Sequence, residues 1–488
     1  MRMLAAALLV LLAVPLRARG AEPAQPKSAA GASTDSTVSA NERGAQAKPP
    51  KTKKPKKAKK PKGDVPAPDE PVNPDEPDET GGKGARATWK QHPSLRFGSV
   101  FRLDFEAKFQ EDGRATYEGA TGLESWELHR NRVGIQGHLF KKIEYEVERE
   151  LTEKELTEKE LSAGQAPKSP WKDVNVNLTF IKNAQVQLGR FKVPFGLDTL
   201  TGVTHNDFIY RSLGANYLTP SRDIGGMVHG RFFQHGLNYS VGVFRHDGDN
   251  ARSRKIQGGD ETFAARLTGT PLRRINPRAF TNLELGSAYT LSSLSDDSFR
   301  PNGLRGRTLL TQDTFFEPVY VKGHRSRWEG DADWTFGSGS ARAEYTVVLD
   351  SRLQQGLANN DLKDARARAW YVSGSWAVTG EKKKRPLKPN NDFLQGGIGA
   401  VEVVARIERL WFDSLGSGEA YRSTRAEFVL PEGEKAFTIG VNWTLNRFVK
   451  LQINGIREDV DRDRNPALPE MFPPAAFWNK VIRLQFVL

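Results

Sequence analysis

Apolar and polar residues alternate along most of the chain after residue 95. The clearest example is the pair FTIGVNWTLN (437–446) and FVKLQINGI (448–456), which are separated by a single residue. Successive side chains of a strand point to opposite faces, so each segment presents one wholly apolar face and one polar face. The chain ends on VIRLQFVL (481–488), where Ile482, Leu484, Phe486 and Leu488 form the same kind of apolar stripe.

Sixteen stretches show this period of two and are predicted to be strands. Their approximate ranges are 95–108, 125–139, 141–150, 171–181, 184–192, 223–234, 237–246, 260–270, 280–292, 324–336, 341–352, 366–379, 397–412, 434–445, 448–458 and 479–488.

The connections between these stretches alternate between long and short. Long ones such as 193–222 and 293–323 follow tight turns such as Lys182-Asn183 and Asn446-Arg447, and only the links 271–279 and 380–396 break the rule. A soluble sandwich has no reason to place its long loops at one end, whereas a bacterial outer-membrane barrel does so. We therefore expect a sixteen-stranded antiparallel transmembrane β-barrel with long outer loops and short periplasmic turns. Its apolar faces would meet lipid, and its polar faces would line a water-filled interior.

Composition agrees with a barrel and disfavours a helical membrane protein. Hydrophobic residues make up 38% of the chain and the mean hydropathy is -0.57. The apolar run Leu4–Leu16, behind Arg2 and before the small residues around Gly20, predicts a cleaved signal peptide over 1–20. The absence of cysteine excludes disulfides, thiol ligands for metals and a lipid-modified N-terminal cysteine.

Residues 21–94 are rich in Ala, Pro, Ser and charge, and they lack hydrophobic periodicity, so we predict a disordered periplasmic spacer before a barrel over 95–488. A basic block at 48–63 is followed by an acidic one at 64–80. The simplest interpretation is a solvated spacer. An alternative function is a structural tether, in which the barrel anchors the protein and Lys51 to Lys62 hold an anionic cell-wall polymer. Behind a signal peptide we expect no nucleic-acid partner.

Four segments resemble the phosphate-selective porin O and P family. They are GRFKVPFGLDTLTG (189–202), YLTPSRDIGGMVHG (217–230), TFAARLTGTP (262–271) and TIGVNWTLNRFVKLQING (438–455), and they occur in the order expected of that family. The resemblance covers most of 95–488 and implies a barrel that is commonly a homotrimer, whose third long loop folds inward to narrow the pore. Residues 193–222 would be that loop. Its candidate anion donors are Lys192, His205, Tyr210, Arg211 and Arg222.

Reading faces from the alternation places a set of basic side chains in the lumen. A row of such charges attracts an anion and replaces part of its hydration, and planar guanidinium suits phosphate oxygens. The pore-lining candidates are Arg102, Arg130, Arg132, Arg231, Arg266, Arg406, Lys450 and Arg483. The competing interpretation is that opposite charges on adjacent strands only brace the wall, because acids also occupy inward positions. These acids are Glu144, Glu146, Glu148, Glu284, Glu329, Asp331, Asp333, Glu344, Asp350, Glu402 and Glu408.

Other chemistry has little support in the sequence. The eight histidines show no metal-ligand spacing, and neither a P-loop nor a GxSxG motif is present, so no metal, cofactor or enzymatic activity is expected. A barrel enzyme acting on lipid would need a Ser or Asp beside a His at the outer rim. The leading hypothesis is a porin in the outer membrane of a Gram-negative bacterium, which passes small anions such as phosphate or polyphosphate by passive diffusion.

Overall fold

The computed structural model describes residues 84–89, 92–117, 120, 125–152, 169–233, 236–251, 261–273, 280–295, 301–461 and 474–488. The predicted signal peptide, the lysine block at 51–62 and most of the spacer lie outside the described residues, as does most of the long loop 151–170. Among the described residues, no helix is long and apolar enough to cross a membrane.

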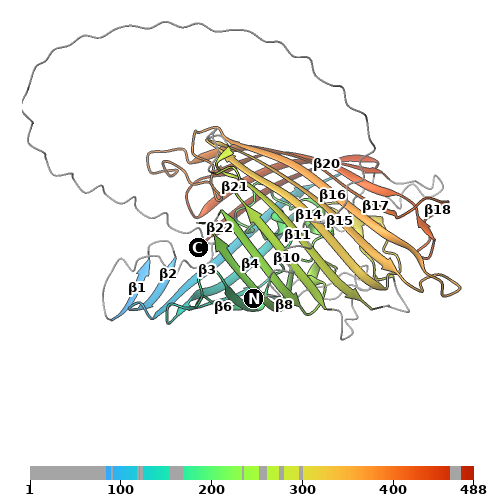
Figure 1. Ribbon diagram of the computed structural model, residues 1–488. Coiled ribbons are helices and arrows are strands. Elements are labelled where there is room, and N and C mark those ends of the chain that lie inside the picture. The colour runs from blue at the N-terminus through green and yellow to red at the C-terminus, as the bar shows by residue number, and fades with distance from the viewer. Residues whose placement is uncertain are drawn as a thin grey trace, which may run out of the picture. The chain divides into compact units, whose positions relative to one another are not determined.

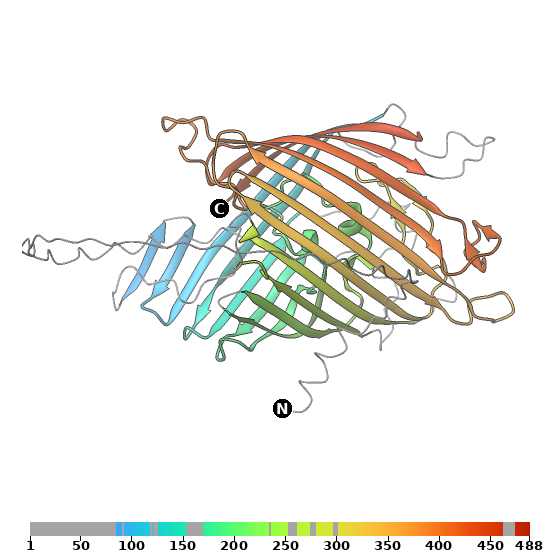
Figure 2. The same ribbon diagram turned by 45° about the horizontal axis from the view of Figure 1, so that its top comes forward.

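Sixteen antiparallel strands close into a barrel (Figures 1 and 2). They are β3 (Phe101–Ala115), β4 (Trp126–Leu139), β5 (Ile143–Glu150), β6 (Trp171–Leu178), β7 (Gln185–Lys192), β8 (Arg222–Phe232), β9 (Leu237–Phe244), β10 (Thr262–Gly269), β11 (Leu283–Leu294), β14 (Gly323–Phe336), β15 (Gly339–Arg352), β16 (Leu362–Ala377), β17 (Ala400–Ser414), β20 (Glu432–Thr444), β21 (Val449–Asp461) and β22 (Ala476–Val487). The predicted strand number and order are confirmed.

The last strand closes the barrel by pairing with the first. In β22, Leu484 lies opposite Glu111 of β3 and Phe486 lies opposite Phe109. The backbone N–H of Leu488 donates to the carbonyl of Ala107, and the N–H of Ala107 donates back to Leu488. Strand β22 therefore satisfies the free edge of β3, which would otherwise be unpaired in lipid.

The side chains are inverted relative to a soluble protein, as the alternation predicted. On β20 the outward Ile439 is 53% exposed, whereas the inward Thr438 is 1% exposed. On β22 the outward Leu484 is 50% exposed and the inward Arg483 is 2% exposed. Because the exposed face is apolar and the covered face is polar, the outer surface suits hydrocarbon.

Aromatic side chains gather on the outer surface near the short turns. Trp334 stacks on Phe280 with ring centroids 5.1 Å apart and lies 4.3 Å from Phe336, which in turn lies 6.3 Å from Trp376. Amphipathic rings favour the boundary between hydrocarbon and headgroups, so this cluster marks one membrane interface.

A short hairpin precedes the barrel and corrects the predicted boundary at Leu95. β1 (Ala85–Trp89) pairs with β2 (Pro93–Phe97), and β2 pairs with the first residues of β3, beyond the point where β22 ends. A turn at residues 98–100, with Gly98 at φ 53°, separates β2 from β3, so the predicted stretch 95–108 is two strands. Arginine and small residues dominate the five residues of β1, so its alternation was too weak to recognise.

The prediction of a polar, water-filled lumen also needs correction, because loops with apolar residues fill part of the lumen. Two long loops fold inward: the constriction loop (residues 193–221), with α3 (Leu197–Leu200) and α4 (Leu213–Tyr217), and the second inward loop (residues 301–322), with β12 (Gly306–Arg307) and β13 (Thr314–Phe316). Phe316 stacks on the inward Phe412 at 4.2 Å, and both belong to an apolar cluster with Leu213, Leu218 and Ile456. Inward apolar residues near the outer strand ends therefore pack on loops. The remaining short elements are α5 (Gly248–Ala251) and the parallel pair β18 (Ala420–Tyr421) and β19 (Phe428–Val429).

The inverted faces predict that a charge in the middle of the outer surface destabilises the barrel. The substitution Ile439→Arg should lower the free energy of unfolding in lipid vesicles by about 2–4 kcal/mol, because lipid cannot solvate the guanidinium at mid-depth. Lys435→Arg, on the same face of β20 but near its end, is the matched control and should change little. Denaturant titration of both variants measures the difference, and equal stabilities would contradict the assigned membrane face.

Candidate functional site

The constriction loop crosses the lumen and contacts strands on its far side. The backbone N–H of Ile209 donates to Oδ1 of Asn454 on β21 at 2.9 Å, although 245 residues separate them. Ser212 caps α4, since its hydroxyl accepts from the N–H of Ala215. Thr199 and Thr219 join the two ends of the loop at 2.7 Å. Residues 193–222 therefore fold into the lumen, as the resemblance implied.

Three cations predicted to line the pore hold this loop by its carbonyls. Arg483 donates to the carbonyl of Ile209 at 2.7 Å, and Arg406 donates to that of Tyr210 at 3.1 Å. Lys450 donates to the carbonyls of Thr204 and Asn206 at 3.2 and 3.1 Å. Each of these side chains points inward as predicted, and each has a structural partner.

Wall carboxylates hold the same loop by its N–H groups. Glu408 accepts from the N–H of Leu213 at 2.6 Å, and Glu344 accepts from the N–H of Asp198 at 3.0 Å. Asp198 in turn accepts from the N–H of Ser212 at 2.6 Å. Because a buried backbone donor without a partner costs free energy, these carboxylates fix the course of the loop.

A third segment reaches the loop from the opposite end of the barrel. The link between β16 and β17 (residues 378–399), called here the inward link, is longer than a tight turn, and its Lys383 contacts both Asp207 of the constriction loop and Glu402 of β17. Arg385 contacts Asp333 at 3.0 Å and Asp207 at 3.4 Å. Burial raises the pKa of Asp207, but Lys383, Arg385 and Arg342 more than offset this and hold that pKa well below its usual range.

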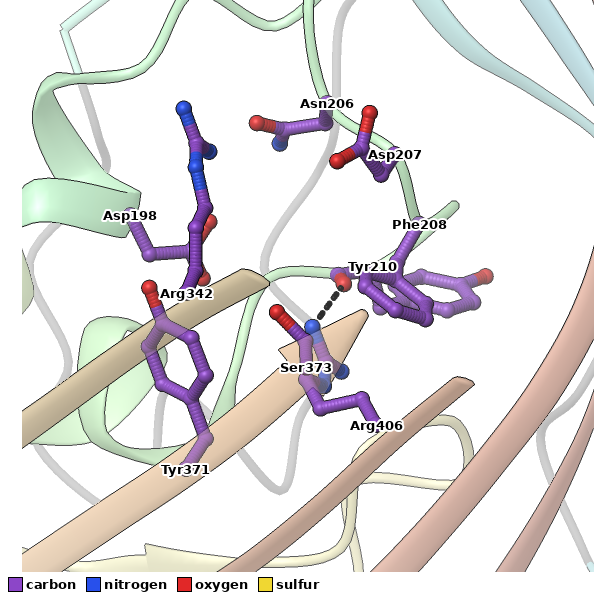
Figure 3. A pocket seen from close by; sticks show the side chains of 9 residues that line it. All are labelled: Asp198, Asn206, Asp207, Phe208, Tyr210, Arg342, Tyr371, Ser373 and Arg406. Carbon is purple, nitrogen blue, oxygen red and sulfur yellow. Dashed lines mark hydrogen bonds between the residues drawn. The ribbon is translucent and has the colours of Figure 1, made fainter. Parts of the chain in front are cut away.

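A small pocket lies between the constriction loop and the wall (Figure 3). Arg342 and Arg406 from the wall face the loop residues Asp198, Asp207 and Phe208 across it. The guanidinium of Arg406 lies 4.6 Å from the ring centroid of Phe208. Cations and carboxylates balance here, so the pocket by itself favours neither sign of charge.

Cations from β4, β6, β8 and β22 lie near Arg211 of the constriction loop. This group, called here the basic cluster, comprises Arg130, Arg132, Lys172, Arg211, Arg222 and Arg483, whose charges act on one another. Burial lowers the pKa of Arg211; Asp198 raises it, while Arg222 and Arg132 lower it further. Carboxylates such as Glu148, Glu150 and Asp173 lie among these cations and offset part of their repulsion.

The members of the basic cluster differ in their partners. Arg132 pairs with Glu148 and Glu150, Arg222 pairs with Asp173, and Arg483 pairs with Asp112. Arg211 lies 3.6 Å from Asp198 and donates to the carbonyl of Thr201. Arg130 instead donates to the amide oxygen of Gln110. Lys172 donates to the carbonyl of Ser169 at 3.5 Å. A neutral amide or carbonyl holds a cation less strongly than a carboxylate does, so Arg130 and Lys172 are held less strongly than the members with carboxylate partners.

The remaining predicted residues are spread along the lumen. Arg102 pairs with Asp104, and Arg266 pairs with both Glu329 and Asp331. Arg231 is exposed at the short-turn end of β8. Lys192 donates to the carbonyls of Leu200 and Thr201. Tyr210 contacts Asp112 at 3.3 Å, and His205 lies in the constriction loop, half-buried.

The geometry agrees with the comparisons to known proteins. The family model for phosphate-selective porin O and P matches residues 102–488. The chain belongs to this family. It is therefore a porin of the outer membrane of a Gram-negative bacterium.

Individual relatives are more distant. Porin O of Pseudomonas aeruginosa is 24% identical over 410 residues, which cover 78% of this chain and 86% of that protein. Among solved structures, OmpT of Vibrio cholerae aligns with a TM-score of 0.48 and 11% identity, covering 80% of this chain and 98% of that one. An anion-selective porin from Comamonas acidovorans aligns with a TM-score of 0.47 and 11% identity, covering 80% and 100%. Because both scores lie below 0.5, the family assignment rests on the family model and the sequence relative.

Sequence reasoning missed the inward link and the second inward loop. Two signals were present. The link broke the rule of short turns and carries the run EKKKRP (381–386), and the second inward loop contains the apolar residues of LLTQDTFFEPVYV (309–321). A long apolar loop on a barrel needs something to pack against, and the lumen provides it.

The inward link predicts unequal roles for two adjacent lysines. Lys383→Met should lower the free energy of unfolding by about 3–5 kcal/mol, because it removes the ion-pair partner of the buried Glu402 and leaves Asp207 with the more distant Arg385, at 3.4 Å. Lys382→Met changes an exposed neighbour and serves as the control. Denaturant titration measures stability, and single-channel noise reports whether the constriction loop becomes mobile. A Lys383→Met protein as stable and as quiet as the control would contradict the proposed clamp.

Proposed function

We propose that this porin passes small anions by passive diffusion, with phosphate or polyphosphate among its solutes. Family membership supports a channel whose relatives are described as phosphate-selective. The observation that carries the proposal in this chain is the basic cluster, in which six cations lie together beside the constriction loop.

An anion entering from the long-loop end meets the lumen where the two inward loops narrow it. There the guanidinium of Arg130 offers planar donors that match phosphate oxygens, and Arg211 lies within electrostatic reach of it. Arg132, Arg222 and Arg483 keep their carboxylate partners and contribute mainly to the local potential. Passage requires sites that bind an anion weakly and then release it. Arg130 meets both conditions, because its guanidinium already donates to the amide oxygen of Gln110.

The other predicted cations serve the function indirectly. Arg406 and Lys450 hold the constriction loop, and their removal would change the width of the passage before it changed the anion contacts. Lys192 and Arg211 also hold carbonyls within the loop. The site residues thus divide into those that meet the solute and those that keep the constriction in place.

The assembly proposed with this function is a homotrimer, as the resemblance implies. Chemical cross-linking of the protein in native membranes, followed by denaturing electrophoresis, tests this state. Recovery of monomers only would overturn it.

A salt gradient across a planar bilayer tests the channel itself. Purified protein should produce conductance steps and a reversal potential of the sign given by anion permeation, and added phosphate should reduce the chloride current by competing in the lumen. A cation-selective reversal potential would remove anion selectivity, and the absence of any conductance would remove the channel.

Arg130→Gln should reduce the anion-to-cation permeability ratio by roughly two- to tenfold, because it removes a cation from a narrow, low-dielectric passage. Arg149→Gln is the matched control, since Arg149 points outward over the ring of Trp171 at 5.2 Å. Reversal potentials of both variants under the same gradient measure the effect. Equal ratios would show that Arg130 does not meet the permeating ion.

A further inference from the structure

A set of cations lies on the outward, lipid-facing side of the barrel near its long-loop end. Its members, called here the outward basic belt, lie on five adjacent strands from β16 to β22. They are Arg366, Arg368, Arg409, Lys435, Arg457 and Lys480. Strand pairing fixes their direction. Arg409 lies opposite Lys435 and Trp370, and Arg457 lies opposite Phe437, all on the face that carries the exposed Ile407 and Ile439.

The belt lies at one height in the membrane. Counted from the long-loop end of each strand, its six residues are three to six positions in, from Lys435 on β20 to Arg368 on β16. That is about 10–20 Å along a strand. The strands are strongly tilted (Figure 1), so residues at the same depth in the membrane are shifted along the register from one strand to the next. The belt residues show this shift, and they lie toward the outer leaflet.

Part of the belt forms no ion pair among the residues that the structure describes. Over these described residues, none of Arg409, Lys435 and Lys480 forms an ion pair. Arg368 and Arg409 flank Trp411, with their guanidinium carbons 4.7 and 5.1 Å from its ring centroid. On these five strands the outward acids at this level are Asp413, which pairs with Arg366 and Arg368, Asp459, which lies beside Arg457 and opposite Lys435, and the exposed Asp461. Three positive charges therefore remain in excess.

The described strands β8 to β11, on the opposite side of the barrel, lack such a belt. Near the long-loop ends of β8 to β11, the outward residues are Ile224, Val243, Phe263 and Leu291, all exposed and apolar. On the strand next to β22, the outward residue near the end is Glu111, so the basic run stops there. Charge at this depth is costly unless a headgroup meets it, and the belt is therefore a local specialisation.

We propose that the outward basic belt binds phosphate groups of an anionic lipid in the outer leaflet. Arginine and lysine donors would contact the phosphate oxygens, and Trp411 and Trp478 would lie beside the acyl chains. The negative charge that neutralises the belt comes from lipid phosphate and not from dissolved phosphate, because the belt faces the bilayer and not the lumen. A second copy is the less suitable partner: the outward positions of the described strands β4 to β15 carry no aspartate or glutamate to meet it.

Binding of purified lipid A, a glycolipid with two phosphates, to the full-length protein in detergent tests this site. The variant Arg409→Gln/Lys435→Gln/Lys480→Gln removes the three unpaired cations. The control Lys142→Gln/Lys182→Gln/Arg447→Gln removes three charges from exposed residues at the short-turn end. Titration by native mass spectrometry gives both affinities, with conductance measured in parallel.

We expect lipid A to bind the belt variant at least about tenfold more weakly than the wild type, while the control variant binds it normally. Monophosphorylated lipid A should bind the wild type more weakly, and millimolar inorganic phosphate should not displace lipid A.

Equal affinities of the two variants would overturn the proposal. Displacement by inorganic phosphate would place the phosphate contact at a site open to water, and loss of oligomers in the belt variant alone would identify the belt as an interface between copies. Either result would also overturn it. An unchanged reversal potential separates all of these outcomes from a failure of the porin function.

Discussion

Closure of the hydrogen-bonded ring is the constraint on which the rest of this structure depends. Lipid offers no partner to a backbone N–H or carbonyl, so a sheet in the membrane is stable only without an edge. In this chain the ring closes where β22 meets β3, and the final leucine exchanges hydrogen bonds with Ala107. Once the ring is closed, alternation fixes which side chains meet lipid and which enter the lumen.

The lumen then has to be filled and kept selective. Sixteen strands enclose more space than wall side chains alone can occupy. The constriction loop, the second inward loop and the inward link occupy part of it, and each does so by different chemistry. The second inward loop packs apolar residues on Phe412 and its neighbours, the constriction loop is held by carbonyl and N–H contacts from charged wall residues, and the inward link is held by ion pairs to Asp207.

Sequence reasoning recovered most of the fold because period-two alternation is a local property. Strands such as β20 and β21 could be placed, and their faces assigned, from ten residues at a time. It failed at β1, where five residues with little apolar character gave no signal, and it expected a polar interior. Inward positions such as Leu410 and Ile456 are apolar because loops distant in sequence cover them, and no local pattern contains that information.

The site shows the same limit more strongly. Alternation correctly turned Arg406, Lys450 and Arg483 inward, but an inward arginine can meet a solute, a carboxylate or a loop carbonyl, and only the three-dimensional partners distinguish these cases. Because burying an unpaired charge is costly, the fold pairs nearly every lumenal cation that the strands supply. Selectivity would then depend on the few cations with weak partners. This is why the proposed anion contact is Arg130, which donates to the amide of Gln110 amid other cations.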